Sequence, residues 1–366
     1  MRSLAMLLDN LDDRAFSRVV ARLAPEIVRN DVELTVIALR RQARPPLLPR
    51  RARVLDLRLG PRPTALGIPR IAGALRLARP DVLFAHGNGP SRAAIVARGL
   101  SSARTRVVAV EHVHYSSFFY TSFHRSRARL RDALTACLYP RADLVAAVSV
   151  GAARDLERRF PRLRGRVAVL PSPGIAPGRT TPGVERAPTI CSVGNVMRRK
   201  GQDVVVRAFA LVRETVPEAE LVLVGREEEP AYARELRALA CDLGLDGCVR
   251  FTGYLEDPLP ILRAAAVYAH GSRTEGFGMA IVEAMACGTP VVVADCPGGP
   301  REILGPERAG IVVPVDDPAA LARGLLRVLR DPAERERLSL AGRSRAARYS
   351  PEAVARGYLA VARSLA

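Results

Sequence analysis

Two glutamates eight residues apart, Glu275 and Glu283, stand in the segment HGSRTEGFGMAIVEAMACGTPVVVADCPGGPREIL at residues 270–304. Glu275 comes directly before a glycine-rich turn, and Glu283 falls within a helical pattern that ends at Gly288. The N–H groups and the positive dipole end at the start of a helix attract an anion. A carboxylate beside them can accept hydrogen bonds from hydroxyl groups. The segment therefore indicates a pocket for a ligand that carries both phosphate and sugar.

Each glutamate also has a purely structural interpretation. For Glu275, which stands where a helix should begin, the alternative is an N-terminal capping carboxylate. Glu283 lies off the apolar face formed by Ile281, Ala284 and Met285, which is also typical of a surface glutamate. The turn at residues 297–300, PGGP, follows the next strand and is expected to close the floor of the pocket.

A second candidate group is the only lysine of the chain, Lys200, in the segment SVGNVMRRKG at residues 192–201. An ammonium is a compact donor that suits a phosphate, and Arg198 or Arg199 can add positive charge. A solvated basic turn explains the same residues equally well, because isolated glycine–lysine patterns are common.

These segments belong to a chain in which short apolar runs alternate with helical patterns. Continuous apolar strands separated by helices predict parallel sheets covered on both faces. The expected strands are residues 4–8, 32–39, 54–57, 82–85, 107–110, 144–148, 167–170, 190–193, 221–224, 249–252, 267–269, 291–294 and 311–313. The fold class is therefore α/β, with ligands expected beyond the carboxyl ends of the strands.

The chain is expected to form two domains joined by a linker. Residues 171–188 are rich in Pro, Gly and Thr, as in an interdomain linker. We predict an N-terminal Rossmann-like domain at residues 1–175 and a C-terminal Rossmann-like domain at residues 176–350, facing a cleft. The final helix, residues 351–366, is expected to pack back onto the first domain.

Positive charge is concentrated in the first half. Residues 1–178 hold 31 arginines against 13 acidic residues, a net +18, whereas residues 179–366 hold 25 basic and 24 acidic residues, a net +1. The first half should therefore meet an anionic partner. Basic residues at 40–53 and 124–141, with the aromatic run 118–120, favour contact with an anionic membrane surface. A solvated face above core aromatics is equally compatible, and nucleic acid is not expected because no binding motif is present.

Other features indicate a cytoplasmic protein, with peripheral contact at the inner face of the plasma membrane. No run approaches 18 uninterrupted apolar residues, and the N-terminal segment MRSLAMLLDN is better explained as a first strand than as a signal peptide. The six cysteines lack CxxC spacing and are expected to be reduced core thiols.

The two motif segments resemble those of the retaining glycosyltransferases of family 4, which have the GT-B fold. In that family the stretches GRLxxxKG and EGFGxxxxEAMAxGxPVV lie in the nucleotide-sugar domain, and the resemblance covers most of residues 189–347. It implies that the domain at residues 176–350 binds the nucleotide sugar and that the domain at residues 1–175 binds the acceptor. It also implies that Lys200 binds the donor diphosphate, that Glu275 contacts the transferred sugar, and that Glu283 holds the ribose. The backbone expected to contact the sugar beside Glu275 is that of Gly276, Phe277, Gly278 and Met279.

The chain departs from the family pattern in two places. Asn195 stands where the family has arginine, so Arg198 or Arg199 would have to complete the diphosphate site beside it. The family's glycine-rich loop after the first strand is absent, since residues 9–14 contain no glycine. We expect residues 86–89, HGNG, to line the cleft in its place.

In the first half, the resemblance places a histidine near the transferred sugar, and His112 in the segment VEHVH fits best. A structural histidine bonded to backbone is equally compatible. Ser149, after the strand at 144–148, is expected to cap the following helix.

The sequence thus predicts a retaining, metal-independent hexosyltransferase without a cofactor. It would transfer a sugar from a UDP-linked donor to a hydroxyl of a lipid-linked or glycan acceptor, in polysaccharide, lipopolysaccharide or glycolipid synthesis. There is no Asp-x-Asp motif and no metal-ligand cluster, so Lys200, arginines and helix N-termini would neutralise the leaving group. Two alternatives are a sugar-nucleotide epimerase of the same architecture and a non-catalytic partner that binds the donor. A dehydrogenase is disfavoured because no GxGxxG follows an early strand.

Overall fold

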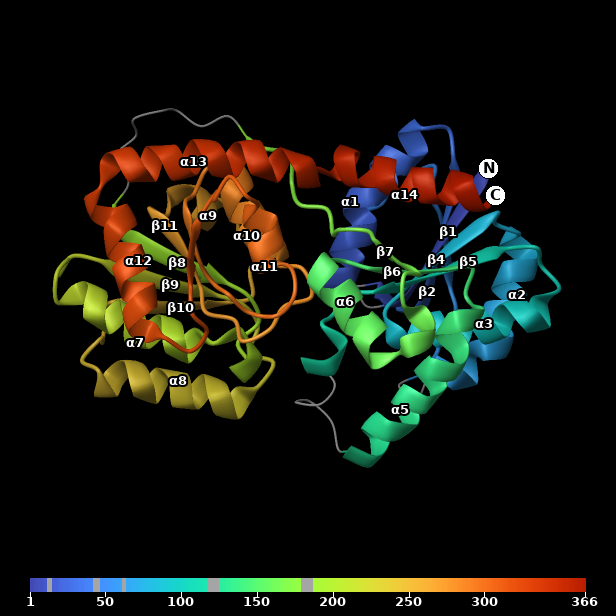
Figure 1. Ribbon diagram of the computed structural model, residues 1–366, viewed down its shortest axis with the longest axis horizontal. Coiled ribbons are helices and arrows are strands. Elements are labelled where there is room, and N and C mark those ends of the chain that lie inside the picture. Colours follow the sequence, from blue (N-terminus) through green and yellow to red (C-terminus); the bar gives the residue numbers. More distant parts are fainter. Residues whose placement is uncertain (12–14, 42–46, 61–63, 118–124, 179–186) are drawn as a thin grey trace. The chain divides into compact units, whose positions relative to one another are not determined.

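The computed structural model describes residues 1–11, 15–41, 47–60, 64–117, 125–178 and 187–366 (Figure 1). The chain forms two compact units. The first comprises residues 1–173 and 351–366, and the second residues 174–350. The expected linker at 171–188 is in part attached to the second unit, because Gly174 N–H donates to Tyr349 O at 2.7 Å and Gly178 N–H to Ala286 O at 3.2 Å.

A sheet of seven parallel strands, in the order β3-β2-β1-β4-β5-β6-β7, forms the centre of the first unit. Its strands are β1 (Ser3–Leu11), β2 (Glu33–Arg41), β3 (Arg53–Asp56), β4 (Val82–His86), β5 (Arg106–Glu111), β6 (Leu144–Ala147) and β7 (Val167–Val169). All five residues of β4 are buried, because helices cover both faces of the sheet.

The helices of the first unit alternate with these strands. They are α1 (Ala15–Arg29), η1 (Thr64–Gly67), α2 (Ile68–Ala78), α3 (Asn88–Ser101), α5 (Arg125–Leu138), η2 (Tyr139–Arg141), α6 (Val150–Arg159), η3 (Pro161–Leu163) and α14 (Pro351–Leu365). Ser149 caps α6 by accepting a hydrogen bond from Ala152 N–H at 3.1 Å, as predicted. The last helix, α14, lies against α1, and its buried Tyr358 packs on Phe84 with ring centroids 5.0 Å apart (Figure 1).

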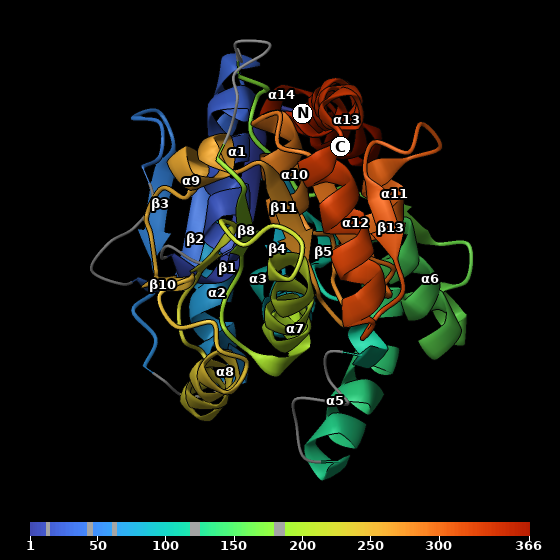
Figure 2. The ribbon, with the colours of Figure 1, turned by 90° about the vertical axis from the view of Figure 1, so that its left-hand side faces the viewer.

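The second unit repeats the plan with six parallel strands in the order β10-β9-β8-β11-β12-β13. They are β8 (Thr189–Val193), β9 (Glu220–Val224), β10 (Val249–Gly253), β11 (Val267–His270), β12 (Val291–Ala294) and β13 (Ile311–Val313). The helices are η4 (Arg198–Lys200), α7 (Gln202–Arg213), α8 (Pro230–Asp242), α9 (Leu259–Ala264), α10 (Met279–Ala286), α11 (Pro300–Leu304), α12 (Pro318–Arg330), α13 (Pro332–Ala346) and η5 (Ala347–Tyr349). In Figure 2 this unit faces the viewer, and α7 lies beside α12.

Each predicted apolar run has become a strand, and the α/β prediction is confirmed. Each sheet also has a point at which the strand order reverses. In the first sheet it falls between β1 and β4, and in the second between β8 and β11. Ligands of doubly wound sheets bind beyond the carboxyl ends of the strands at such a point. The topology therefore directs attention to the residues that follow β8 and β11, and to those that follow β4.

The cysteine prediction holds only in part. All six are free thiols; Cys191, Cys287 and Cys296 are buried, whereas Cys137 and Cys241 are exposed. Over the described ranges, no helix combines the length and the apolar character that crossing a bilayer requires.

Candidate functional site

An ion pair lies where the strand order of the second sheet reverses. Lys200 is the last residue of η4, in the loop after β8, and Glu275 lies in the loop after β11. The Lys200 ammonium donates to Glu275 Oε1 at 2.6 Å. The fold thus joins the two residues of the separate sequence motifs. The lysine side chain keeps 22% of its surface exposed, so its charge remains accessible to a ligand.

Two further side chains contact the same carboxylate oxygen. Ser272 Oγ donates to Glu275 Oε1 at 2.7 Å, and His270 Nε2 lies 3.3 Å from it. Glu275 is only 6% exposed, and this burial by itself raises the pKa of its carboxyl. The Lys200 ammonium, the hydrogen bond from His270 and the charge of Arg199 outweigh burial and hold that pKa well below its usual range. Glu275 is therefore an anion that can accept hydrogen bonds from hydroxyl groups.

Close backbone approaches fix the loop that carries Glu275. Glu275 N–H donates to Pro297 O at 3.0 Å, so the predicted PGGP turn supports this loop. Gly298 has φ +123°, and a Cβ there would lie 1.9 Å from Glu275 O. Gly201, with φ +60°, approaches Gly271 so closely that a Cβ would lie 2.0 Å from Gly271 O. Only glycine permits such contacts.

Gly298→Ala is therefore expected to displace the Glu275 loop and to destabilise the second unit by about 3 kcal/mol or more, because backbone strain and overpacking add. Hydrogen exchange of peptides from β11 and α10 measures the effect. The matched control is Gly244→Ala, which also has positive φ (+67°) but no atom within 4 Å of the new methyl group. The control should cost only about 1–2 kcal/mol. Equal protection of these peptides in both variants would contradict the prediction.

The N-terminus of α10 adds main-chain donors beside Glu275. The helix begins at Met279, and its N-cap, Gly278, has φ +114° and makes no side-chain capping bond. The interpretation of Glu275 as an N-cap is therefore wrong. The first N–H groups of a helix have no intrahelical acceptor and can bind an anion or a sugar oxygen. The Phe277 side chain packs edge-on against Tyr349 at 5.2 Å, and the residue is 3% exposed. The contact of the backbone at residues 276–279 with a sugar stays a prediction.

Glu283 is buried within α10 rather than exposed. It is 2% exposed, so its interpretation as a surface glutamate is wrong. The helix is covered on both sides, because it packs against β11 and β12 and also against α13. The contact of Glu283 with a ribose stays a prediction.

The polar residues between Gly194 and Lys200, which are Asn195, Arg198 and Arg199, have different partners. Arg199 Nη1 donates to Thr274 O at 2.8 Å and lies 3.9 Å from Glu275 Oε2, so it belongs to the Lys200–Glu275 site. Arg198 instead forms an ion pair with Glu235 and stacks over Tyr232. The structure thus assigns the additional charge beside Lys200 to Arg199.

Asn195, predicted to bind substrate, is exposed in the same loop. Its side-chain amide donates to Glu228 Oε1 at 3.2 Å. Its carbonyl oxygen accepts a hydrogen bond from Gln202 Nε2 at 3.0 Å, which ties the loop to the start of α7. The Asn195 side chain is therefore not one of those that contact Glu275.

The first unit places His112 directly after β5, beside the end of β4. Its Nε2 lies 2.8 Å from Nδ1 of His86, and Phe16 packs on its ring with centroids 4.7 Å apart. The side chain therefore bonds to another histidine, and the interpretation as a histidine bonded to backbone is wrong. Burial holds the pKa of His112 well below its usual range and lowers that of His86 to about 4. Both rings are neutral near pH 7.

A buried carboxyl group precedes this histidine. Glu111 accepts hydrogen bonds from Tyr139 OH at 3.1 Å, from His112 N–H at 3.2 Å and, weakly, from Asn88 Nδ2 at 3.5 Å. Burial raises the pKa of Glu111 to about 7, because these hydrogen bonds only partly offset the loss of water. This carboxyl is therefore half protonated near neutral pH.

This titration predicts a pH-dependent stability. Native Glu111 keeps its proton up to about pH 7, whereas the unfolded chain releases it near pH 4.5. The contribution is therefore fully present below pH 4.5 and is lost as the pH rises through about 7, in total about 3 kcal/mol. The free energy of unfolding of the unchanged protein, minus that of Glu111→Gln, should fall by this amount from pH 4.5 to 7, measured by hydrogen exchange of β4 and β5. The exposed Glu352→Gln in α14 is the control, and a pH-independent difference for Glu111→Gln would contradict the prediction.

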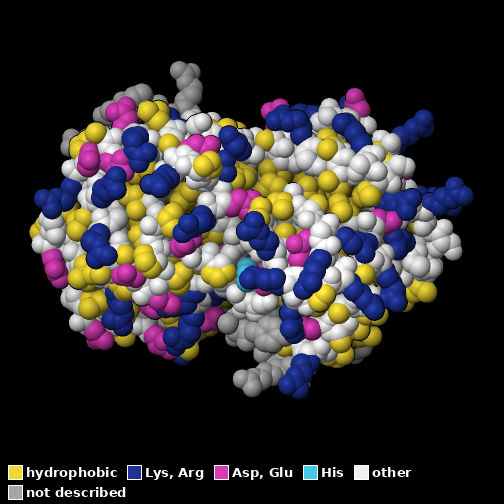
Figure 3. Space-filling view, in the orientation of Figure 1, with side chains coloured by type: hydrophobic (Ala, Val, Ile, Leu, Met, Phe, Trp, Pro, Cys, Tyr) yellow, Lys and Arg dark blue, Asp and Glu magenta, His cyan; other side chains and the backbone are white. Residues whose placement is uncertain are grey.

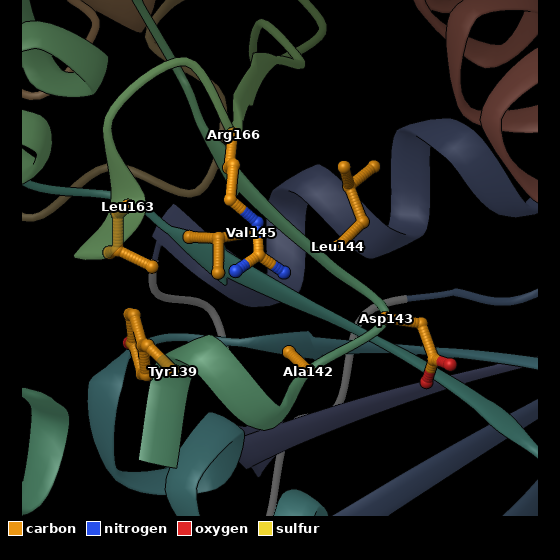
Figure 4. A pocket seen from close by; sticks show the side chains of 7 residues that line it. All are labelled: Tyr139, Ala142, Asp143, Leu144, Val145, Leu163 and Arg166. Carbon is orange, nitrogen blue, oxygen red and sulfur yellow. The ribbon is translucent and has the colours of Figure 1, made fainter. Parts of the chain in front are cut away.

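A separate cavity of about 190 Å³ lies at the opposite edge of the first sheet (Figure 4). Asp143, Leu144 and Val145 line it at the amino end of β6, with Arg166 before β7. Asp143 there accepts hydrogen bonds from Arg106 and from Val107 N–H, a structural role. Because doubly wound sheets bind ligands at the other end of their strands, this cavity is not the candidate site. No trio of His, Cys, Asp or Glu in the described ranges is arranged to hold a metal ion.

Sequence motifs indicated no role for His270 and Ser272, and they placed His86 only within the segment at residues 86–89. His270 is the last residue of β11 and His86 the last of β4, so each ends a strand next to a reversal of strand order. That position is the signal that would have identified them.

Comparisons with known proteins agree with this architecture. The family model "Glycosyltransferase Family 4" matches residues 16–174, and "Glycosyl transferases group 1" matches residues 180–345. The fold and the paired motifs define a two-domain GT-B protein. The chain belongs to the group 1 glycosyltransferases of family 4.

Curated relatives are glycosyltransferases by name, and the names of some include a lipid or a lipid-linked acceptor. N-acetylgalactosamine-N,N'-diacetylbacillosaminyl-diphospho-undecaprenol 4-alpha-N-acetylgalactosaminyltransferase of Campylobacter jejuni is 27% identical over 76% of this chain and 75% of its own. D-inositol 3-phosphate glycosyltransferase of Salinispora arenicola is 34% identical over 60% of this chain and 54% of its own. Phosphatidyl-myo-inositol mannosyltransferase of Mycobacterium leprae is 39% identical over 43% of this chain and 41% of its own. The chain thus spans about half the length of the last two.

Solved structures share the fold along the whole chain. Anabaena HepE, in complex with UDP and glucose, superposes with a TM-score of 0.80 at 20% identity, covering 100% of both chains. WaaG, a glycosyltransferase involved in lipopolysaccharide biosynthesis, gives 0.75 at 18% identity, covering 98% of this chain and 99% of its own. At these identities the similarity shows the fold alone.

Proposed function

We propose that the protein is a retaining, metal-independent glycosyltransferase that moves a sugar from a UDP-linked donor to a hydroxyl of a lipid-linked or glycan acceptor. The observation that carries the proposal is the Lys200–Glu275 pair where the strand order of the second sheet reverses. It combines a partly exposed ammonium, a carboxylate held in its ionised form and the start of α10, whose N-cap makes no side-chain capping bond. Diphosphate and sugar hydroxyls need these groups.

In the proposed reaction, Lys200 and Arg199 bind the donor diphosphate, while Glu275 and the backbone of residues 276–279 hold the sugar. The bond between the anomeric carbon and the phosphate oxygen breaks, and a bond from that carbon to the acceptor oxygen forms on the same face. The departing phosphate oxygen takes the acceptor's proton, so no strong protein base is needed. The negative charge that develops on the phosphate is stabilised by the fixed positive groups around it.

Names of the relatives support parts of this scheme. The Campylobacter protein is named as a 4-alpha transferase to an undecaprenol-linked acceptor, and other relatives are inositol-lipid transferases. HepE was solved with UDP, whereas a Corynebacterium glutamicum relative, 36% identical over 169 residues, is named as GDP-mannose-dependent. UDP-sugars are therefore the first donors to test, and GDP-sugars the second.

The first unit is proposed to meet an anionic membrane that carries the acceptor. Its surplus of arginine favours such a surface, and helix α5 adds exposed Leu130 (65%) and Leu134 (44%) beside exposed Arg129. Apolar side chains next to basic ones suit the boundary of an anionic bilayer. Figure 3 shows dark-blue basic side chains with fewer magenta acidic ones over the first unit, whereas acidic and basic side chains are interspersed over the second. The aromatic run 118–120 and the Arg125 and Arg127 side chains lie outside the described residues.

Replacing Leu130 and Leu134 together by serine should weaken binding to vesicles rich in anionic lipid by about 2 kcal/mol, roughly thirtyfold in partition. Flotation of the full chain with anionic and with neutral vesicles measures it. Leu340→Ser, at an exposed leucine (53%) of α13, is the matched control. Unchanged flotation of the double variant, or equal flotation with neutral vesicles, would refute this docking face.

Thermal unfolding with a panel of UDP- and GDP-sugars tests the donor, because stabilisation follows affinity and reaches about 2.7 kcal/mol at a hundredfold excess over Kd. The stabilising donor is then incubated with lipid-linked acceptors, and the anomeric configuration of the product is read by NMR. Retention supports the proposal and inversion refutes it. Epimerisation of the donor alone would instead establish an epimerase, and binding without transfer a non-catalytic partner.

A further inference from the structure

Two buried histidines form a pair where the strand order of the first sheet reverses. His86 ends β4 and is paired in register with Val110 of β5, and His112 lies two residues beyond Val110. The contact of 2.8 Å between His86 Nδ1 and His112 Nε2 is a hydrogen bond. Phe16 packs on the His112 ring, and the Tyr358 ring is stacked near His86 with centroids 6.3 Å apart, so an aromatic ring flanks each histidine.

A hydrogen bond between two neutral imidazoles holds one proton, which belongs to one ring or the other. If His112 carries it at Nε2, His86 must carry its own proton at Nε2. If His86 carries it at Nδ1, His112 must carry its own at Nδ1. In the first arrangement, His112 Nδ1 has a lone pair and can only accept a hydrogen bond from a ligand. In the second, His112 Nδ1 carries a proton and can only donate one.

The surroundings of His86 distinguish these arrangements. His86 Nε2 is enclosed and has no hydrogen-bond partner among the described residues. A proton there would be a buried donor without an acceptor, which folded proteins avoid more strictly than an unused lone pair. His86 therefore donates through Nδ1–H, and its Nε2 keeps only a lone pair.

His112 is then protonated at Nδ1. This nitrogen has no partner in the described part of the chain, yet it is not among the enclosed atoms, and the residue keeps 8% of its surface. We propose that His86 is a positioning residue that fixes His112 as a neutral Nδ1–H donor toward a ligand oxygen, not as a base. This inference rests on the proposed function in that the oxygen would belong to a substrate of the proposed transfer reaction.

Nitrogen-15 NMR of the full chain, with labelled histidine and no ligand, reads the tautomer directly. His112→Gln assigns the resonances. We expect His112 to show a protonated, pyrrole-type Nδ1 and a bare, pyridine-type Nε2, and His86 a pyrrole-type Nδ1. A pyrrole-type Nε2 on His112 would overturn the proposal, whether or not the protein is a transferase.

Two variants separate the donated hydrogen bond from packing. His86→Leu removes the donor, whereas His86→Asn places an amide N–H close to the lost Nδ1–H. The nitrogen-15 signature of His112, a pyrrole-type Nδ1 and a pyridine-type Nε2, should change in His86→Leu and be preserved in His86→Asn. With a donor from the thermal screen, kcat should fall in the first variant and recover in the second, with KM little changed. Loss of the signature in both variants, or in neither, would overturn the role of His86; intact exchange protection of β4 and β5 shows that the variants fold.

Discussion

Lys200→Ala is expected to lower kcat for glycosyl transfer by about 10²–10³-fold and to raise KM for the donor. The size follows from removing one preorganised charge that stabilises negative charge in the transition state. Lys200 has this position because η4 brings its ammonium to 2.6 Å from Glu275 in a site where Arg199 is the other nearby cation. Steady-state kinetics with the donor from the thermal screen measure the effect.

Arg198→Ala is the matched control for Lys200→Ala. Arg198 lies in the same short helix, but it pairs with Glu235 and stacks over Tyr232. It should retain most activity, because its charge is engaged away from Glu275. Lys200→Arg should restore only part of the rate, since a planar guanidinium does not replace a compact ammonium. Full activity in Lys200→Ala would refute the assignment of the diphosphate to this residue.

Glu275→Ala is expected to reduce transfer at least as strongly, with the second unit still folded. The carboxylate gathers three donors, so its loss removes the acceptor for sugar hydroxyls and releases Lys200, Ser272 and His270 from their positions. Glu275→Gln keeps the shape but not the charge and should lie between the alanine variant and the unchanged protein. Transfer rate and exchange protection of β11 are measured together, with Glu307→Ala, at an exposed glutamate, as control.

The double variant Lys200→Ala/Glu275→Ala tests whether the two residues act as a unit. Residues that act together lose far less in combination than the product of their single effects. The double variant should therefore be little worse than either single variant. Strictly multiplicative losses would show that the two residues serve independent steps.

The sequence predicted the strands well because parallel strands buried on both faces must be apolar throughout. The β12 run Val291–Ala294 is buried at every position, and no helical pattern competes with it. The helix that contains Glu283 was harder to predict, because α10 is buried on all sides. A pattern with one apolar face suggested an exposed glutamate, but packing between the sheet and α13 covers every residue from Ile281 to Ala286.

The contacts between side chains of separate loops were less predictable than the helices and strands. Motif spacing identified Lys200 and Glu275 individually, but the Ser272 hydroxyl and the His270 ring reach the same oxygen only through the course of the loop after β11. Arg198 and Arg199 are adjacent and identical in type, yet they pair with different carboxylates, Glu235 and Glu275. Their directions are set by the turn of η4, which composition does not specify.

The return of α14 to the first unit has a consequence for the order of folding during synthesis. The second unit is one continuous stretch, residues 174–350, whereas the first unit also needs residues 351–366. All of the second unit is therefore synthesised before the helix that places Tyr358 against Phe84 and near His86. Until α14 is made, the first unit lacks the helix that packs against α1 and places Tyr358 on Phe84 of β4. The first unit begins the chain but is the last to receive all of its residues.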